Sequence, residues 1–203
     1  MNTLIDLLTE RVGPYMSKKR LEHTLGVART SDWICDFFPD LSKDNVIIAS
    51  MLHDVAKELD TAEQLRLIRD FSVSITDEDA ATRPALHSFA AVALIKRDFP
   101  DLAYDTVLSA VYNHTLGTPG MSVADRIVFL ADFIEPGRTH SSAIEIREYL
   151  KAALRFGNPR ENERALNKCV LMAIESTVSH LASDGVAPNS STLALRNEIL
   201  SLI

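Results

Sequence analysis

The stretch VIIASMLHDVAKEL, residues 46–59, decides the fold that the sequence predicts. Its apolar residues recur at the spacing of helix turns, and the polar–apolar alternation of a strand is absent. The same helical spacing continues along almost all of the 203 residues. The sequence therefore predicts an all-α protein in which the helices form one bundle.

Start and stop signals divide the chain into helices. Serine or threonine precedes several helical patterns, as an N-cap does, at Ser17, Ser42, Thr61, Thr76 and Ser122. Prolines fall between the patterns, at Pro39, Pro100, Pro119, Pro136 and Pro159. These signals predict roughly nine helices, with ends defined to within about two to four residues. The loop GVAPNSS, residues 185–191, is expected to be the most flexible segment, before a short final helix.

The composition favours one domain that spans residues 1–203. Apolar residues make up 46% of the chain, enough for one substantial core. The 28 acidic and 21 basic residues give a formal net charge of −7. This charge argues against a nucleic-acid partner, because such a partner needs an extended basic surface. Any phosphate that the protein binds is therefore expected to be held locally.

The cysteines and the N-terminus indicate the cellular location. Cys35 and Cys169 are too few for a disulfide framework, and both lie in apolar helical patterns, which fits a reducing cytoplasm. The first residues lack a basic lead and a long apolar run, so no signal peptide is predicted. No run of about 18 apolar residues exists to span a membrane. We expect a cytoplasmic protein without membrane contact.

Four of the six histidines stand where metal ligands are expected. They are His23 in the middle of a helical pattern, His53 next to Asp54, His87 at the start of an apolar helix and His114 at the end of another. Imidazole and carboxylate together favour divalent first-row transition metals, so iron, manganese, cobalt or zinc is expected. Successive helical residues diverge by about 100°, so His53 and Asp54 share one ion only if other helices supply further ligands. His140 and His180 lack such neighbours and are expected to be surface or capping residues.

Lys57 follows His53 by four residues and Asp54 by three, which places all of them on one face of a helix. The Lys57 ammonium is expected to point toward the metal site and to bind a phosphate oxygen. The alternative is a helix-surface pair of His53 and Asp54 beside a solvated lysine. The dipeptide by itself does not separate the two interpretations.

A second group of candidates lies in residues 113–138. Asp132 stands among apolar neighbours, where a buried carboxylate is costly unless it is paired or binds a metal, so a ligand role is predicted. The alternative is a salt bridge to a nearby arginine or lysine, and Asp125 is assigned to the surface. Arg138 follows Pro136 and Gly137, where its guanidinium is placed to chelate phosphate oxygens unless it is a solvated loop residue.

The order H, HD, H, H, D along an all-helical chain resembles the HD superfamily of phosphohydrolases. Four segments resemble more narrowly the YqeK family: KRLEHTLGVA at 19–28, LHDVAKEL at 52–59, NHTLGTPGMS at 113–122 and FLADFIEPGR at 129–138. STLALRN at 191–197 is similar to that family's closing signature, so the likeness covers nearly the whole chain. The segment 139–164 is longer than is usual in the family, and the residues that flank His87 are atypical.

The resemblance implies an enzyme that hydrolyses diadenosine tetraphosphate symmetrically to two ADP by attack of metal-bound water or hydroxide. It implies an iron-type ion on His23, His53, Asp54 and Asp132, with Asp54 also acting on the water. It implies that Lys57, His87, His114 and Arg138 act in catalysis and face the phosphates, unless His87 and His114 bind a second ion. The nucleotide would contact these four residues, His23, Asp132 and, in the C-terminal loop, Pro188, Ser191 and Thr192. The metal site would occupy about residues 17–138, and residues 139–203 would cover the nucleotide pocket.

Several alternatives stay open on the sequence. Another HD-type activity, a nucleotide phosphohydrolase or a cyclic-nucleotide phosphodiesterase, would use the same ligands. A sensor would bind the nucleotide without turnover, and a purely structural metal would have a closed ligand shell. The expected partner is a small dinucleoside polyphosphate, and the sequence leaves open both the base preference and the formation of a homodimer.

Overall fold

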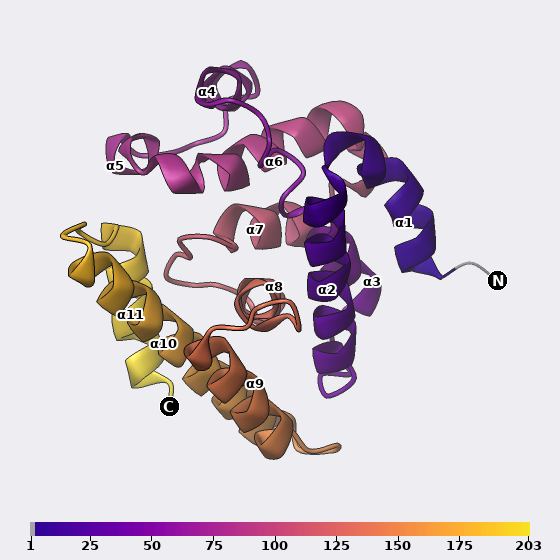
Figure 1. Cartoon of the computed structure of the whole chain (residues 1–203). Coiled ribbons are helices and arrows are strands. Elements are labelled where there is room, and N and C mark those ends of the chain that lie inside the picture. The colour runs from indigo at the N-terminus through magenta and orange to yellow at the C-terminus, as the bar shows by residue number, and fades with distance from the viewer. Residues whose placement is uncertain (1–2) are drawn as a thin grey trace.

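The computed structural model describes residues 3–203, and within them every regular element is a helix (Figure 1). The α-helices are α1 Leu4–Val12, α2 Lys18–Cys35, α3 Lys43–Leu52, α4 Thr61–Asp70, α5 Asp77–Ala81, α6 Leu86–Asp98, α7 Asp105–Asn113, α8 Val123–Ile134, α9 Ser141–Ala153, α10 Pro159–Ser183 and α11 Ser190–Ser201. Short 3-10 helices stand at Gly13–Tyr15, Arg83–Ala85 and Pro100–Leu102. The predicted all-α fold is confirmed.

The helix starts follow the predicted caps closely. Ser17, Thr76 and Ser122 accept a hydrogen bond from the backbone of the first helical turn, and Ser42 occupies the cap position of α3 without such a bond. Thr61 is not a cap but the first residue of α4. The cap is Asp60, which accepts a hydrogen bond from the Glu63 N–H at 2.8 Å. The described residues hold eleven α-helices where roughly nine were expected. Helices as short as the five residues of α5 leave too little periodicity to be recognised.

Four helices, α2, α3, α7 and α8, form the centre of the bundle. α2 packs on α3 and α8, and α7 packs on the same two helices. Their apolar faces hold fully buried side chains such as Val27, Met51, Val111 and Ile127. Each such side chain contributes about 1.5–3 kcal/mol of hydrophobic free energy. α6 packs on α7, and α4 packs on α6 at the upper edge in Figure 1.

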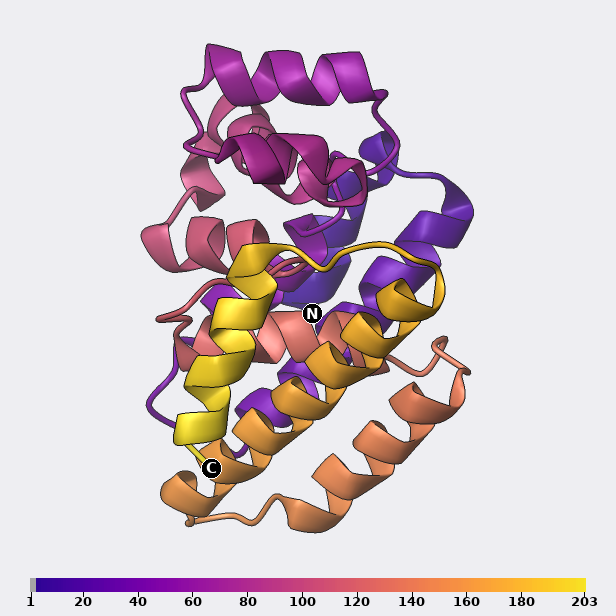
Figure 2. The same cartoon turned by 90° about the vertical axis from the view of Figure 1, so that its left-hand side faces the viewer.

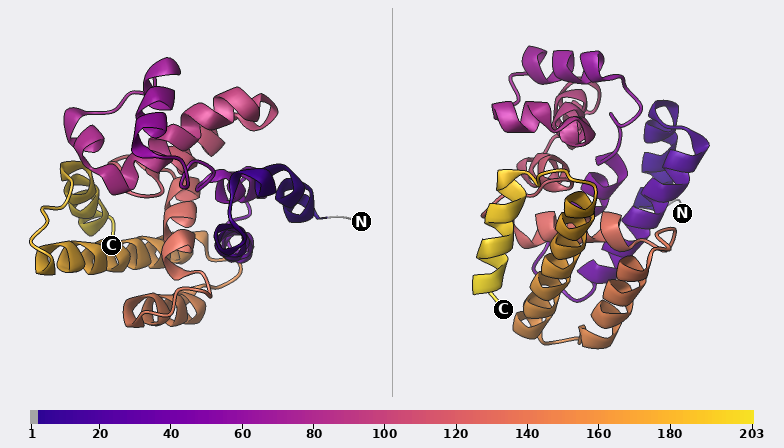
Figure 3. Two further views of the ribbon diagram at one scale, coloured as in Figure 1. Left: turned by 45° about the horizontal axis from the view of Figure 1, so that its top comes forward. Right: turned by 60° about the vertical axis from the view of Figure 1, so that its left-hand side comes forward.

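The C-terminal helices lie against the outer side of α8. α10 contacts α8, α9 and α11. Figure 2 and Figure 3 show α9, α10 and α11 as one layer beside the four central helices. None of the helices in residues 3–203 combines the length and the apolar character that a membrane crossing requires.

The start of α11 is tied to two distant parts of the chain. The Asn189 side-chain amide donates to Asp79 Oδ1 at 3.1 Å, and the Ser190 N–H donates to Glu78 Oε1 at 2.8 Å, both on α5. The Thr192 hydroxyl donates to the Leu116 carbonyl at 2.8 Å, in the turn after α7. The predicted loop 185–191 thus ends at Asn189, and these bonds hold the start of α11 close to α5 and to the segment that carries His114.

Candidate active site

The HD dipeptide lies just beyond the end of α3 and not within a helix. α3 ends at Leu52, and residues 53–58 form consecutive turns with bonds such as Lys57 N–H to Asp54 carbonyl at 2.9 Å. The shared helical face predicted for His53, Asp54 and Lys57 is therefore wrong. The turns nevertheless direct both members of the dipeptide inward, since His53 is fully buried and Asp54 is 3% exposed. A helix-surface pair is excluded.

The central helices bring the six predicted residues into one cluster, which we call the His–Asp cluster: His23, His53, Asp54, His87, His114 and Asp132. Asp54 lies at its centre. Its Oδ2 is 3.6 Å from His53 Nε2 and 3.8 Å from His23 Nε2. Its Oδ1 is 3.2 Å from His87 Nε2 and 3.7 Å from His114 Nε2. The two oxygens thus face different pairs of imidazoles.

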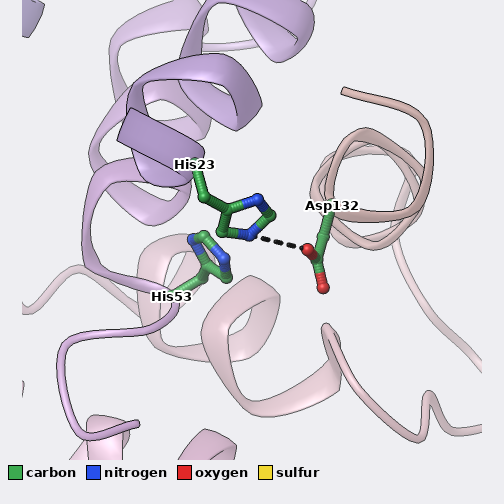
Figure 4. A group of neighbouring side chains, drawn as sticks. All are labelled: His23, His53 and Asp132. Atoms are coloured by element: carbon green, nitrogen blue, oxygen red, sulfur yellow. Dashed lines mark ion pairs between the residues drawn. The ribbon is translucent and has the colours of Figure 1, made fainter. Parts of the chain in front are cut away.

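Asp132 faces the cluster from α8 (Figure 4). Its Oδ1 is 3.0 Å from His23 Nε2, an ion-pair distance without hydrogen-bond geometry. Arg138 Nη2 donates to the same oxygen at 2.6 Å. The sequence posed a ligand role and a salt bridge as alternatives for Asp132, and the carboxylate both contacts the cluster and pairs with an arginine. Figure 4 shows His23, His53 and Asp132 converging on one point from three segments of the chain.

Main-chain carbonyls orient three of the four imidazoles. His53 Nδ1 donates to the Ser50 carbonyl at 2.6 Å, and His114 Nδ1 donates to that of Val111 at 2.6 Å. Each carbonyl belongs to the last turn of a helix, where the carbonyls have no partner in a following turn. His87 Nδ1 donates in the same way to the Pro84 carbonyl at 2.8 Å. With Nδ1 as the donor, Nε2 keeps its lone pair, and it faces the cluster.

His23 is oriented by a carboxylate, Glu135. It lies in the middle of α2, where the carbonyls are taken up by the helix, and its Nδ1 is 3.1 Å from Glu135 Oε1. Glu135 is 5% exposed and also accepts from the Gly137 N–H at 2.6 Å. A Cβ at Gly26 would lie 2.5 Å from Glu135 Oε2, so the absence of a side chain there admits the carboxylate. Sequence reasoning missed Glu135, because its partner His23 lies 112 residues away in the chain.

Glu135→Gln is expected to weaken metal binding about 10- to 100-fold, because a partner that orients a metal-binding imidazole has an effect of that size. The amide keeps the shape of the side chain but removes the charge that favours Nδ1–H on His23. Isothermal calorimetry with manganese on the metal-depleted protein measures the change. Glu163→Gln, which alters an ion pair with Arg126 away from the cluster, is the matched control and should bind manganese like the wild type. Equal affinity of both variants would contradict the assignment.

Three cations border the cluster. Arg20, which sequence reasoning also missed, donates from Nη1 to Asp54 Oδ2 at 2.5 Å. Lys57 Nζ lies 3.1 Å from His87 Nε2 and is half-buried, so it is not a solvated lysine. Arg138 keeps 40% of its side chain exposed while it pairs with Asp132. Positive charge therefore stands on several sides of the carboxylates.

Burial and neighbouring charges set the protonation of the cluster. Burial lowers the pKa of His53 and of His87 to about 4, so both rings are neutral near pH 7. Burial alone would raise the pKa of Asp54, but the imidazoles of His53, His114 and His87 outweigh it and hold the pKa well below the ordinary value. Burial lowers the pKa of Lys57. His53 and His87 thus offer neutral imidazoles, and Asp54 offers an ionised carboxylate.

These residues fit a divalent metal ion. Ligand atoms of His23, His53 and Asp132 lie within 4.8 Å of one another, and so do those of His53, Asp54 and His114. Donors about 2.0–2.2 Å from one ion have comparable separations. Within residues 3–203, the buried Nε2 atoms of His53 and His23 have no hydrogen-bond partner, an arrangement that is costly unless a ligand completes it. The cluster is able to hold a divalent ion.

The remaining candidates lie elsewhere. Pro188, Ser191 and Thr192 stand in the loop before α11 and in its first turn, and Thr192 reaches the turn that follows His114 through Leu116. Asp125 was assigned to the surface, and this is wrong: it is 2% exposed and closes the capping box of α8 with Ser122. His140 caps α9 by accepting from the Ala143 N–H, as expected for a capping residue.

Comparisons with known proteins agree with this geometry. Residues 20–137 match the HD domain family. Bis(5'-nucleosyl)-tetraphosphatase, symmetrical, of Halalkalibacterium halodurans is 27% identical over 189 residues, 93% of this chain and 93% of that protein. The protein of the same name from Staphylococcus aureus is 25% identical over 182 residues, 90% of this chain and 87% of that protein. A crystal structure of a predicted HD superfamily hydrolase involved in NAD metabolism, from Clostridium acetobutylicum, has a TM-score of 0.81 and 28% identity, and covers 97% of this chain and 96% of that one.

The helical bundle is that of an HD superfamily hydrolase, and the chain belongs to the HD domain family. Within that family it is similar, over nine-tenths of its length, to symmetrical bis(5'-nucleosyl)-tetraphosphatases. The family resemblance noted in the sequence is thereby confirmed.

Proposed function

We propose that the protein hydrolyses diadenosine tetraphosphate symmetrically to two ADP, with a divalent ion, iron in first place, held by His23, His53, Asp54 and Asp132. The observation that carries this proposal is that imidazoles and carboxylates meet in one buried cluster, in which the Nε2 atoms of the imidazoles face one point. The names of the similar proteins support the substrate and the symmetry of cleavage.

The ion, when bound, would supply positive charge for a phosphoryl oxygen and would lower the pKa of a water molecule to about 7. Asp54 is ionised and central, so it orients the attacking water or accepts its proton. The Nε2 atoms of His53 and His23 face the same point, because their Nδ1 atoms are engaged elsewhere. The bundle excludes bulk water from His53 and Asp54, which strengthens these interactions.

The cations border the place where phosphate charge develops. Attack on phosphorus accumulates negative charge on the equatorial and leaving oxygens, and fixed cations stabilise it. Lys57 is held against His87, and the exposed part of Arg138 faces the solvent from which a substrate arrives. We propose that Lys57, His87, His114 and Arg138 contact the phosphates.

His87 and His114 also support a second ion. Their Nε2 atoms are 3.0 Å apart, and both Nδ1 atoms donate to carbonyls. Two lone pairs at that distance repel each other unless a proton or a cation lies between them. We propose a second divalent ion at this position when the metal is in excess.

Symmetric cleavage requires the site to hold the substrate so that the second phosphoanhydride bond, counted from one end, is the bond that is cleaved. A pocket must therefore hold one nucleoside diphosphate half. We assign Pro188, Ser191 and Thr192 to its wall, with the helices of residues 139–203 covering it. The bond from Thr192 to the Leu116 carbonyl supports this placement, because Leu116 lies two residues after His114.

Product analysis tests the proposed function. The metal-depleted protein is expected to be inactive, and iron, manganese, cobalt or zinc should each be tried for recovery. Chromatography of the reaction with diadenosine tetraphosphate should then show ADP alone. ATP with AMP, or turnover only of mononucleotides or cyclic nucleotides, would assign a different HD-type activity. Tight binding without any product would identify a sensor.

A further inference from the structure

A cavity of about 670 Å³ opens beside the His–Asp cluster, between one face of α2 and the loop from α8 to α9. Its α2 wall includes Lys19, His23, Gly26 and Arg29, which follow one another at helical spacing and so share a face. Arg138 lies in the opposite wall. The volume is in the range of sites that bind nucleotide-sized ligands, about 300–1,000 Å³.

The cavity lies on one side of Asp54 only. His23 and Arg20 line it, and both face the Oδ2 atom of that carboxylate. His87 and His114, which face Oδ1, do not line it. The C-terminal residues reach the Oδ1 side, through the turn that follows His114. The Oδ2 side of Asp54 therefore has room for one end of a substrate that reaches the cluster.

The charges of the cavity favour an anion. Two of its acids are already engaged: Glu58 accepts from the Ser17 N–H at 2.8 Å, and Glu135 binds His23 and Gly137. Glu22 also lines the cavity and is exposed, as Lys19 and Arg29 are. Lys19 and Arg29 make no ion pair within the part of the chain that the structure describes. On a chain with net charge −7, Lys19 and Arg29 outnumber Glu22, the one acid of the cavity that is not engaged, and this excess of positive charge favours an anion there.

We propose that this cavity binds the second nucleoside diphosphate half of the substrate, while the other half lies on the His87–His114 side. The cations of Lys19 and Arg29 contact its phosphates, and Arg20 and Arg138 stand where its phosphate chain meets the cluster. This inference rests on the proposed function. It predicts two nucleoside diphosphate sites in each chain, one on each side of Asp54.

The double variant Lys19→Glu/Arg29→Glu tests the cavity without altering the cluster. It is expected to raise KM for diadenosine tetraphosphate about tenfold or more, the effect of losing one or more charge-assisted contacts, with kcat nearly unchanged. Calorimetry of ADP with the metal-loaded protein should give two ADP per chain for the wild type and one for the variant. Lys18→Glu, one residue away on α2 and outside the cavity, is the matched control and should behave like the wild type.

The outcomes separate the two proposals. If the wild type cleaves the dinucleotide to ADP and the double variant matches Lys18→Glu in KM and in ADP stoichiometry, the cavity is not a substrate site. If the wild type leaves the dinucleotide intact, the proposed function fails, and the ADP stoichiometry of the variants still decides whether the cavity binds a nucleoside diphosphate. One ADP per wild-type chain would overturn the inference.

Discussion

Asp54→Asn is expected to lower kcat/KM for diadenosine tetraphosphate at least about 1,000-fold, which corresponds to about 4 kcal/mol of transition-state stabilisation. The carboxylate lies within 3.8 Å of the Nε2 atoms of all four imidazoles. The amide keeps the shape but loses the charge that we propose to hold the metal and to act on the water. Steady-state kinetics, metal content per chain and far-ultraviolet circular dichroism measure the effect, and the helical spectrum should be retained.

Asp125→Asn is the control for this variant. Asp125 is as buried as Asp54, but it caps α8 and accepts from the Ser109 hydroxyl at 3.0 Å, away from the cluster. Its replacement should lower the melting temperature and leave kcat/KM close to that of the wild type. A metal-loaded Asp54→Asn enzyme within tenfold of wild-type activity would remove Asp54 from the chemistry.

Lys57→Ala is expected to lower kcat about 100- to 1,000-fold, the cost of about 2.7–4 kcal/mol seen when a single preorganised donor is removed from a developing anion. Metal content should be unchanged, because Lys57 contacts the His87 ring and offers no ligand for a cation. Single-turnover kinetics with elemental analysis separates the two effects.

Lys43→Ala provides the comparison for Lys57. The Lys43 ammonium also pairs with neighbouring side chains, Asp32 at 2.8 Å and Asp36 at 2.7 Å, but it lies at the other end of α3. Its loss should affect stability alone. If the Lys57 and Lys43 variants retain equal kcat, the phosphate role of Lys57 is refuted.

The sequence predicts those features that depend on neighbours along the chain. Helical periodicity, the caps at Ser17, Thr76 and Ser122, and the histidines at helix ends are all local patterns. Asp125 was misassigned although Ser122 and Asp125 form a recognisable capping box. The end of α3 at Leu52 was missed because neither glycine nor proline marks it.

Contacts between distant helices were beyond reach of the sequence. Glu135 meets His23 across 112 residues, and Arg20 meets Asp54 across 34, so neither pair leaves a periodic trace. The cavity beside α2 likewise exists only because the α8–α9 loop passes close to that helix. Residue type predicted the members of the His–Asp cluster, whereas tertiary packing determined which side chains support them.

The backbone bonds of His53, His87 and His114 limit how the metal preference of this protein can change. A carbonyl is present whatever residue carries it, so substitutions at Ser50, Pro84 or Val111 that preserve the backbone leave those rings pointing as before. Only the ring of His23 depends on an exchangeable side chain. Directed evolution toward a different ion should therefore accumulate its changes around Glu135 and the glycines that make room for it.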